Sequence, residues 1–262
     1  MITIVKIGGN VIDNPALLSD FLDKFAQIDG PKVLIHGGGK IATELSLRLG
    51  VEPQLVDGRR ITNAETIDIV TMVYAGLVNK KMVAALQARG CNAIGLSGAD
   101  ANIICGVQRP KEPIDFGFVA DLNEDSVHDD HLKQLLYDGF TPVFSAIVHD
   151  GKGNLLNCNA DTIASAIAVA LSKKGDTKLV YCFEKKGVLK DINDDSSVIS
   201  LIKKDEFGEL ISTGVVAKGM LPKLQNSFDA LAKGVGSVVI TQAEDVLTAS
   251  GAPLACGTTL SL

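Results

Sequence analysis

Two apolar stretches near the beginning of the chain each end in consecutive glycines: Ile4-Val5-Lys6-Ile7-Gly8-Gly9-Asn10 and Val33-Leu34-Ile35-His36-Gly37-Gly38-Gly39-Lys40. A strand that ends in glycines and runs into a helix leaves backbone N–H groups bare, because no side chain keeps a phosphate away from them. Lys6 supplies a positive charge beside the first turn. One such turn is often purely steric. Two in succession predict a site for a phosphorylated ligand.

Hydrophobic periodicity around these glycine turns predicts the fold class. The first four elements are predicted as a strand, a helix, a strand and a helix, over about 2–7, 14–28, 32–35 and 39–49. Strands that alternate with helices through short connections form parallel sheets with helices on both faces. We therefore expect an α/β fold with a parallel sheet covered by helices on both faces.

A polar break at residues 173–176 is the predicted boundary between two lobes, 1–175 and 176–262. The first lobe contains a predicted amphipathic helix over about 63–89, which starts with Thr62 and Glu65 at capping-box spacing. A helix of this length is long enough to span a dimer interface.

Composition favours small-molecule partners. The 262 residues carry a formal net charge of −6 with dispersed lysines and arginines, which argues against a nucleic-acid surface. Five cysteines form no C-x-x-C pair and no zinc-type spacing, so we predict reduced thiols and no metal site. No run approaches about 18 apolar residues, and a strand is predicted from residue 2. We expect a cytoplasmic protein without a membrane segment.

Two further segments carry charged groups that a phosphorylated ligand would need. Neither glycine turn completes G-x-x-x-x-G-K-[ST], or G-x-G-x-x-G with an acidic residue at the right distance. Farther on, Asn157-Cys158-Asn159-Ala160-Asp161 precedes a predicted helix, which Asn159 or Asp161 would alternatively cap. The segment Lys218-Gly219-Met220-Leu221-Pro222-Lys223 places a lysine in a first helical turn, against the helix dipole. That placement indicates an anion nearby.

Lys6, Asp161 and Lys223 together are suited to phosphoryl transfer. The transition state spreads charge over the equatorial oxygens of the transferred group, so lysines and backbone N–H groups can supply most of the catalysis. An aspartate between two lysines would hold both ammonium groups. If the acceptor is a carboxylate, it is already ionised near neutral pH and needs no general base. The absence of an obvious catalytic histidine fits such an acceptor.

These segments resemble the amino acid kinase family over nearly the whole chain. The resemblance rests on Lys6-Ile7-Gly8-Gly9, His36-Gly37-Gly38-Gly39, Asp57-Gly58-Arg59-Arg60-Ile61-Thr62, Gly95-Leu96-Ser97-Gly98, Gly117-Phe118-Val119, Asn157-Cys158-Asn159-Ala160-Asp161 and Gly219-Met220-Leu221-Pro222-Lys223. It implies transfer of the γ-phosphoryl group of ATP, as its Mg²⁺ complex, to the side-chain carboxylate of N-acetyl-L-glutamate, the second step of arginine biosynthesis. It also implies an α/β fold with an open, mainly parallel sheet sandwiched by helices, in two lobes. Lobe 1–175 would bind the acyl amino acid and dimerise, and lobe 176–262 would bind ATP.

The resemblance further implies a role for each catalytic and phosphate-binding residue. Lys6 and Lys223 would stabilise the transferring phosphoryl group. Asp161 would orient the two lysines. Gly8 and Gly9 would offer backbone N–H groups to the phosphates.

For the acyl amino acid, the resemblance implies backbone contacts from Gly37 and Gly38. Arg60 would pair with the α-carboxylate, which its planar fork matches bidentately. Asn157 would hold other polar groups of the substrate. Two alternatives stay open: a larger acyl group, as in N-succinyl-L-glutamate, because acyl selectivity depends on pocket volume, and a non-catalytic amino acid sensor.

One segment departs from the family pattern. Relatives usually carry Thr or Ser followed by Asp after the strand that enters the second lobe, whereas this chain reads Tyr181-Cys182-Phe183-Glu184. The resemblance therefore does not assign the adenine and ribose contacts in this segment. Relatives that arginine inhibits are hexamers with an additional N-terminal helix, so the resemblance implies an arginine-insensitive homodimer for this chain.

Overall fold

The computed structural model describes residues 1–262 except 174, 213, 215, 217–219 and 252–255. The strands of its central sheet are β1 (Ile2–Ile7), β2 (Lys32–His36), β5 (Ala93–Leu96), β8 (Thr141–Ser145), β11 (Thr177–Phe183), β12 (Leu201–Lys203), β13 (Ser237–Gln242) and β14 (Thr258–Ser261). Shorter strands form the ribbons β3 (Leu55–Val56) with β4 (Arg59–Arg60), β6 (Val107–Gln108) with β7 (Ala120–Asp121), and β9 (Ile147–His149) with β10 (Leu155–Asn157).

The α-helices are α1 (Gly9–Ile12), α2 (Pro15–Ala26), α3 (Gly39–Arg48), α4 (Ala64–Thr71), α5 (Asn79–Gln87), α6 (Asp129–Tyr137), α7 (Ala160–Ser172), α8 (Phe207–Ser212), α9 (Leu221–Ala232) and α10 (Val246–Ser250). A π-helical segment, η1 (Met72–Val78), joins α4 to α5, and single 3₁₀ turns lie at η2 (Asp100–Asn102) and η3 (Ala243–Asp245).

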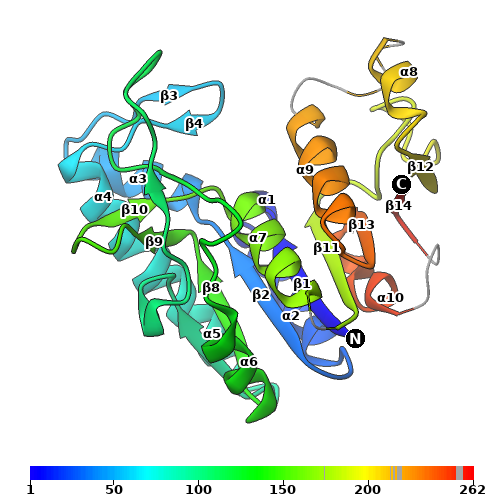
Figure 1. Cartoon of the computed structure of the whole chain (residues 1–262), viewed down its shortest axis with the longest axis horizontal. Helices are drawn as coiled ribbons and strands as arrows, with labels where there is room; N and C mark the ends of the chain where they lie inside the picture. The colour runs from blue at the N-terminus through cyan, green and yellow to red at the C-terminus, as the bar shows by residue number, and fades with distance from the viewer. Residues whose placement is uncertain (174, 213, 215, 217–219, 252–255) are drawn as a thin grey trace.

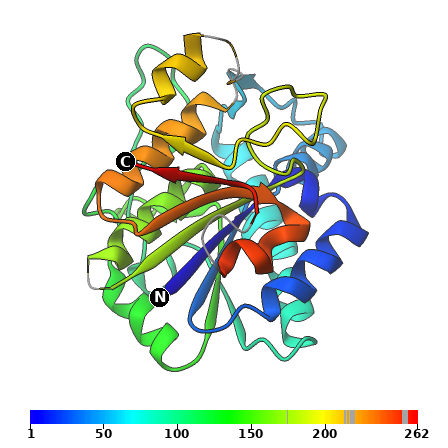
Figure 2. The ribbon, with the colours of Figure 1, turned by 90° about the vertical axis from the view of Figure 1, so that its right-hand side faces the viewer.

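The central sheet has the strand order β12-β14-β13-β11-β1-β2-β8-β5 (Figure 1). Every neighbouring pair is parallel except β13 with β14. Helices α6, α7 and α9 pack over one face, and α2, α5 and α10 cover the other (Figure 2). The predicted α/β fold, with a mainly parallel sheet between helices, is confirmed.

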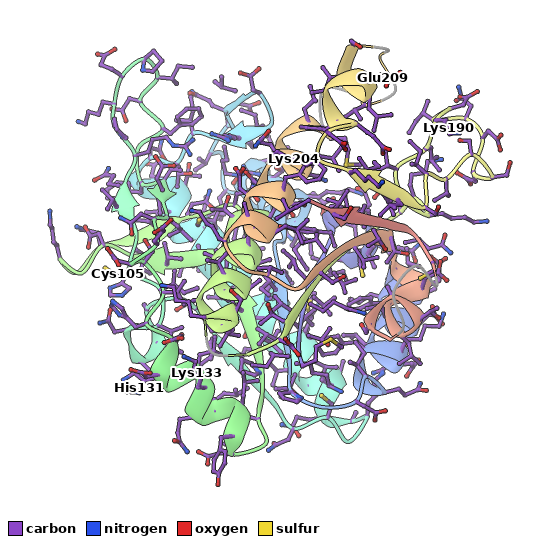
Figure 3. All side chains as sticks on the ribbon, turned by 45° about the vertical axis from the view of Figure 1, so that its right-hand side comes forward. Cys105, His131, Lys133, Lys190, Lys204 and Glu209 are labelled. Atoms are coloured by element: carbon purple, nitrogen blue, oxygen red, sulfur yellow. The ribbon has the colours of Figure 1, made fainter. Side chains whose placement is uncertain are left out.

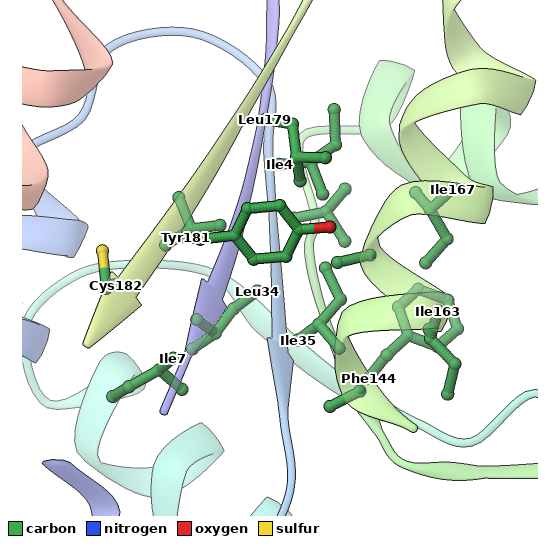
Figure 4. Close-up of a cluster of buried hydrophobic side chains, with 14 of the residues drawn as sticks. Ile4, Ile7, Leu34, Ile35, Phe144, Ile163, Ile167, Leu179, Tyr181 and Cys182 are labelled. Atoms are coloured by element: carbon green, nitrogen blue, oxygen red, sulfur yellow. The ribbon is translucent and has the colours of Figure 1, made fainter. Parts of the chain in front are cut away.

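The central strands are buried on both faces, which explains why they read as continuous apolar runs. All seven residues of β11 are buried, and so are Ile4, Val5 and Ile7 of β1. Figure 4 shows Ile163 and Ile167 of α7 facing the side chains of these strands. This packing places the first turn of α7 beside the carboxyl ends of β1 and β11.

The predicted helix over 63–89 is continuous from α4 to α5, but its middle is the π-helical segment η1. Within the described residues, it is the one helix whose length and apolar composition would suffice to cross a membrane. Its residues Val70, Val73, Met82 and Leu86 are buried in the hydrophobic core. It is therefore a core helix of a globular fold.

The sheet is continuous across the predicted lobe boundary at 173–176, because β1 pairs directly with β11. The far corner of the second predicted lobe is formed by β12, α8 and the loop before them, where Lys190 and Lys204 lie (Figure 3). The division of functions between lobes 1–175 and 176–262 stays a prediction.

Candidate active site

The candidate site lies at the carboxyl edge of the sheet, where three parallel strands end side by side. β1 carries Lys6 and runs into the turn at Gly8 and Gly9, β2 runs into the turn at Gly37, and β11 ends at Phe183. Open α/β sheets bind their ligands at this edge. The two glycine turns are therefore neighbours in space as well as in sequence pattern.

Lys6, Asp161 and Lys223 come together from three elements. Nζ of Lys6 lies 2.7 Å from Oδ1 of Asp161 in the first turn of α7, and both residues are buried. Lys223 lies in the first turn of α9, and its Nζ is 3.6 Å from the centroid of the Phe183 ring. Burial lowers the pKa of Lys223, Asp161 raises it in part, and Lys6 lowers it again. Asp161 thus pairs directly with Lys6 and acts on Lys223 only at longer range.

Asn159 and Asp161 divide the two roles that the sequence left open at this helix. Asn159 is the N-cap of α7, and its side-chain oxygen accepts a hydrogen bond from the N–H of Asp161 at 2.7 Å. The carboxylate of Asp161 pairs with Lys6 instead. The hydroxyl of Tyr181 donates to the backbone carbonyl of Asp161 at 3.2 Å, which fixes the helix end against β11.

The two glycine turns differ in the hydrogen bonding of their backbone N–H groups. The N–H of Gly8 donates to the carbonyl of Cys182 at 2.8 Å, so in this conformation it is not free for a phosphate. Gly9 is the first residue of α1, and Gly38 is the N-cap of α3. N–H groups at helix N-termini lack intrahelical partners and favour anions. At Gly38, φ is +154° and a Cβ would lie 3.0 Å from the Tyr74 ring, so any other residue there would be strained.

A buried histidine supports the second glycine turn. Nδ1 of His36 lies 2.8 Å from the carbonyl oxygen of Gly37, and Nε2 lies 3.0 Å from Nδ2 of Asn79. Because an amide nitrogen only donates, Nε2 accepts and Nδ1 carries the proton. Burial lowers the pKa of His36 to about 4, so the ring is neutral near pH 7. Asn79 also donates to the carbonyl of Val143, which ties the turn to β8.

Arg60 is buried with one nitrogen left for a ligand. Its Nη2 donates to the carbonyl of Gly39 at 3.0 Å and to Oγ1 of Thr43 at 2.7 Å. Its Nη1 is buried and has no hydrogen-bond partner among the described residues. Buried charged groups are normally paired, so an anionic ligand at this nitrogen would be favoured. Asn157 lines the same space, held by a hydrogen bond to Oγ1 of Thr62 at 3.1 Å.

Two cavities meet at Lys6. The first has a volume of about 280 Å³, and residues 37–39, Arg60, Asn157 and Asp161 lie among those that line it. The second has a volume of about 340 Å³, and its lining includes Gly8, Gly9, Phe183, Glu184 and Lys223. Lys6 lines both cavities. All nine predicted site residues therefore lie at these two cavities, and Lys6 is placed to act on ligands in either.

Sequence reasoning missed several residues that build the site. Tyr74 and Asn79 lie in the long helix, where a polar or aromatic residue every few positions gives no distinct signal. Phe183 was noticed only as a departure from the family pattern. Arg109, directly after β6, and Asp121, in β7, also line the first cavity, and both strands are too short for periodicity to detect. Lys218 and Gly219, which belong to a predicted motif, lie outside the described residues.

Comparison with known proteins connects this geometry to a family. The model of the amino acid kinase family matches residues 1–242. An acetylglutamate kinase of Cytophaga hutchinsonii is 58% identical over 245 residues, which cover 93% of this chain and 92% of the relative. An acetylglutamate kinase of Bacteroides fragilis is 52% identical over 250 residues, covering 95% of each.

Solved structures share the fold at lower identity. The protein smu.665 of Streptococcus mutans superposes with a TM-score of 0.78 at 25% identity, covering 99% of this chain and 98% of the other. An N-acetylglutamate synthase of Neisseria gonorrhoeae, complexed with coenzyme A and N-acetylglutamate, superposes with a TM-score of 0.82 at 20% identity, covering all of this chain and 59% of the other. With the family model matched over nearly the whole sequence, the chain belongs to the amino acid kinase family.

Proposed function

We propose that this chain transfers the γ-phosphoryl group of ATP to the side-chain carboxylate of N-acetyl-L-glutamate, the second step of arginine biosynthesis. The observation that carries the proposal is the position of Lys6, which pairs with Asp161 and lines both cavities. Relatives named acetylglutamate kinase, at 58% and 52% identity over more than nine-tenths of the chain, support the choice of acceptor.

The first cavity, with Arg60 and Asn157, is the proposed acceptor cavity. The α-carboxylate of the acceptor would give the buried Nη1 of Arg60 the anionic partner that it lacks among the described residues. Asn157 would bind the N-acyl amide. The side-chain carboxylate would then reach Gly37, Gly38 and Lys6 at the other end of the cavity. This orientation directs the reacting oxygen toward the second cavity.

The second cavity, with Gly9 and Lys223, is the proposed nucleotide cavity. An oxygen of the ionised acceptor carboxylate attacks the γ-phosphorus, and the bond from phosphorus to the β–γ bridging oxygen breaks. The products are an acyl phosphate and ADP. Lys6 and Lys223 stabilise the charge that spreads over the transferring oxygens, and Asp161 holds Lys6 in position. No step requires a proton to leave the acceptor.

Magnesium enters this proposal as part of the nucleotide substrate. Within the part of the chain that the structure describes, no group of three or more His, Cys, Asp or Glu side chains is placed to hold a metal ion. Mg²⁺ commonly uses substrate phosphates together with water as ligands. The ion would bridge phosphate oxygens, and the two lysines would contact the remaining charge.

The acyl end of the acceptor is proposed to lie near Arg109 and Asp121. Nε of Arg109 lies 3.0 and 3.2 Å from the two carboxylate oxygens of Asp121, and its Nη2 also contacts that carboxylate. The pair neutralises both charges, which suits an uncharged acetyl group. The guanidinium of Arg109 in the cavity wall favours N-succinyl-L-glutamate as a second candidate, because a succinyl carboxylate could compete with Asp121 for it.

A homodimer in the cytoplasm is also part of the proposal. The π-helical segment η1 exposes Met72 and Leu77, at 54% and 44% of their surface, on the long helix. Apolar side chains exposed next to each other are candidates for a contact with a second copy. All five cysteines are free, as in a reducing compartment. Sedimentation of the purified protein would test the dimer, and a monomer at micromolar concentration would contradict it.

The reaction itself can be tested with two acceptors in parallel. The protein is incubated with ATP, Mg²⁺ and either N-acetyl-L-glutamate or N-succinyl-L-glutamate, and hydroxylamine traps the acyl phosphate. We expect product with the acetyl compound at the higher kcat/KM. Product only with the succinyl compound would change the acceptor. ATP binding without product from either would favour the non-catalytic sensor.

A further inference from the structure

The ring of Phe183 contacts the ammonium groups of both lysines of the site. Its centroid lies 3.6 Å from Nζ of Lys223 and 4.8 Å from Nζ of Lys6. The ring is stacked on Tyr181, with centroids 6.3 Å apart and an interplanar angle of 10°. Figure 4 shows the Tyr181 hydroxyl directed toward α7, where it binds the carbonyl of Asp161. β11 thus connects the ring to the backbone of Asp161 through one stacked pair.

The ammonium group of Lys223 has no direct carboxylate partner among the described residues. Asp161, from α7, is already paired with Lys6, from β1. Among the residues that the structure describes, no carboxylate lies within 4.0 Å of Nζ of Lys223. Glu184, which follows β11, attracts the Lys223 ammonium group at longer range. Its Oε1 accepts a hydrogen bond from the side chain of Asn10. Lys185 lines the cavity and pairs with Asp195.

Burial and the nearby Lys6 both disfavour the charged form of Lys223. Burial is the largest cause of its lowered pKa, and Asp161 and Glu184 oppose that shift. The π face of an aromatic ring carries negative partial charge, and it attracts an ammonium group within about 6 Å of the centroid. An aliphatic side chain of similar volume would exclude water equally well without that attraction.

We propose that Phe183 is a positioning residue that holds the ammonium group of Lys223 charged and directed into the nucleotide cavity before ATP binds. This role rests on the proposed function of Lys223 in phosphoryl transfer. The ring acts through the lysine and leaves the reaction itself unchanged. A side chain that only forms the wall of the cavity needs the right volume. The role proposed for Phe183 also needs the π face of an aromatic ring.

The test compares Phe183→Leu with Phe183→Tyr. Leucine removes the π face, and tyrosine keeps it. For Phe183→Leu we expect kcat to fall about tenfold at neutral pH, and the alkaline limb of the kcat profile to move down by about one pH unit. The KM for the acceptor stays unchanged. Phe183→Tyr restores most of the activity and the alkaline limb.

Phe228→Leu is the matched control for loss of a buried ring. Phe228 is fully buried in α9, and its ring lies 5.0 Å from Nζ of Lys204, outside the site. We expect this variant to lower stability without moving the alkaline limb. Unchanged kinetics in Phe183→Leu would overturn the proposal. Equal impairment in the leucine and tyrosine variants, with an unmoved alkaline limb, would overturn it as well, because volume would then explain the effect.

A second measurement does not depend on turnover. NMR titration of the ¹³Cε resonance of Lys223, assigned with Lys223→Arg, reports the pKa of its ammonium group directly. We expect a pKa about one unit lower in Phe183→Leu than in the unsubstituted protein. The same pKa in both would refute the role of the ring. If no acceptor is phosphorylated, the proposed function fails, but this titration still decides whether Phe183 supports the lysine.

Discussion

The acceptor cavity and the nucleotide cavity are built in different ways. In the acceptor cavity, protein hydrogen bonds hold the polar side chains, as Gly39 and Thr43 hold Arg60. In the nucleotide cavity, Lys223 rests against the ring of Phe183, with no carboxylate within 4.0 Å among the described residues. Hydrogen bonds therefore position Arg60 in the acceptor cavity, and a cation–π contact positions Lys223 in the nucleotide cavity.

This difference fits what each cavity would bind. A small acyl amino acid presents a few polar groups at fixed spacing, and hydrogen bonds recognise such a pattern. A triphosphate that brings its own magnesium presents diffuse charge, which ammonium groups can stabilise without a fixed bonding direction. Substitutions in the acceptor cavity should therefore raise the KM for the acceptor, whereas substitutions among the lysines should lower kcat.

Lys223→Ala should have the largest effect. Removal of a preorganised donor to the transferring group lowers kcat by about 10³-fold. The KM for N-acetyl-L-glutamate should stay near its original value, because Lys223 does not line the acceptor cavity. Lys204→Ala serves as the control, since Lys204 also lies over an aromatic ring but lines neither cavity. If Lys223→Ala instead raised the KM for the acceptor and left kcat unchanged, the proposed difference between the two cavities would be wrong.

His36→Gln should change how the free energy of unfolding depends on pH below neutrality. The folded-state pKa of His36 is about 4 and the reference value is 6.5, so between these values the unfolded chain binds a proton that the native ring does not. Stability from this residue is present above pH 6.5 and is lost as pH falls toward 4, by about 3 kcal/mol. Urea unfolding at a series of pH values should show that His36→Gln loses this part of the pH dependence.

His131→Gln is the control for this measurement. His131 is exposed on α6 (Figure 3), so its substitution shows what loss of a histidine outside the core does to stability. Equal slopes for the unsubstituted protein and His36→Gln would mean that the ring is protonated in the folded state. A protonated His36 could not accept the hydrogen bond from Asn79, so the hydrogen bonds that connect Asn79, His36 and Gly37 would have to differ.

Arg60→Lys should raise the KM for the acceptor by about 10- to 100-fold, because a lysine cannot keep the bonds to Gly39 and Thr43 and also present a second nitrogen to a carboxylate. The KM for ATP should not change. Arg59→Lys, one residue away and exposed, should have a much smaller effect. Steady-state kinetics with each substrate varied in turn would measure both. Equal losses for the two arginines would point to general charge attraction.

Much of the fold could be predicted because its signals are local. The order of strand, glycine turn and helix at 2–9 and 32–39 predicts parallel strands whose carboxyl ends meet. The antiparallel pairing of β14 with β13 could not be predicted, because residue pattern does not report strand direction. The π-helical segment η1 was missed for a similar reason, since its apolar spacing continues that of a regular helix.

The site was predictable where a residue stands out against its local context. Lys223 opposes a helix dipole, and the glycines remove side chains from helix N-termini. Phe183 and Asn79 have no such signal, because their roles depend on the register of distant segments. The two ends of the Lys6–Asp161 pair are 155 positions apart in the sequence, and only the packing of α7 on β1 brings them to 2.7 Å.

Asp121→Asn should give the smallest effect, and it tests how the acceptor cavity selects an acyl group. The pair of Arg109 and Asp121 is partly exposed, so its strength is modest. Loss of the carboxylate charge leaves the guanidinium available to an incoming anion. The ratio of kcat/KM for N-succinyl-L-glutamate to that for N-acetyl-L-glutamate should then rise by about fivefold.

Arg109→Gln is the matched variant, because it removes the attraction and should lower the same ratio below that of the unsubstituted protein. If neither substitution changes the ratio, the acyl group lies elsewhere in the cavity, against Cys158 or Val119. If both raise it, cavity volume selects the acyl group, since each substitution alters the pair that fills this wall. Opposite shifts in the two variants would show that charge in the wall of the acceptor cavity, rather than its size, discriminates between acetyl and succinyl groups.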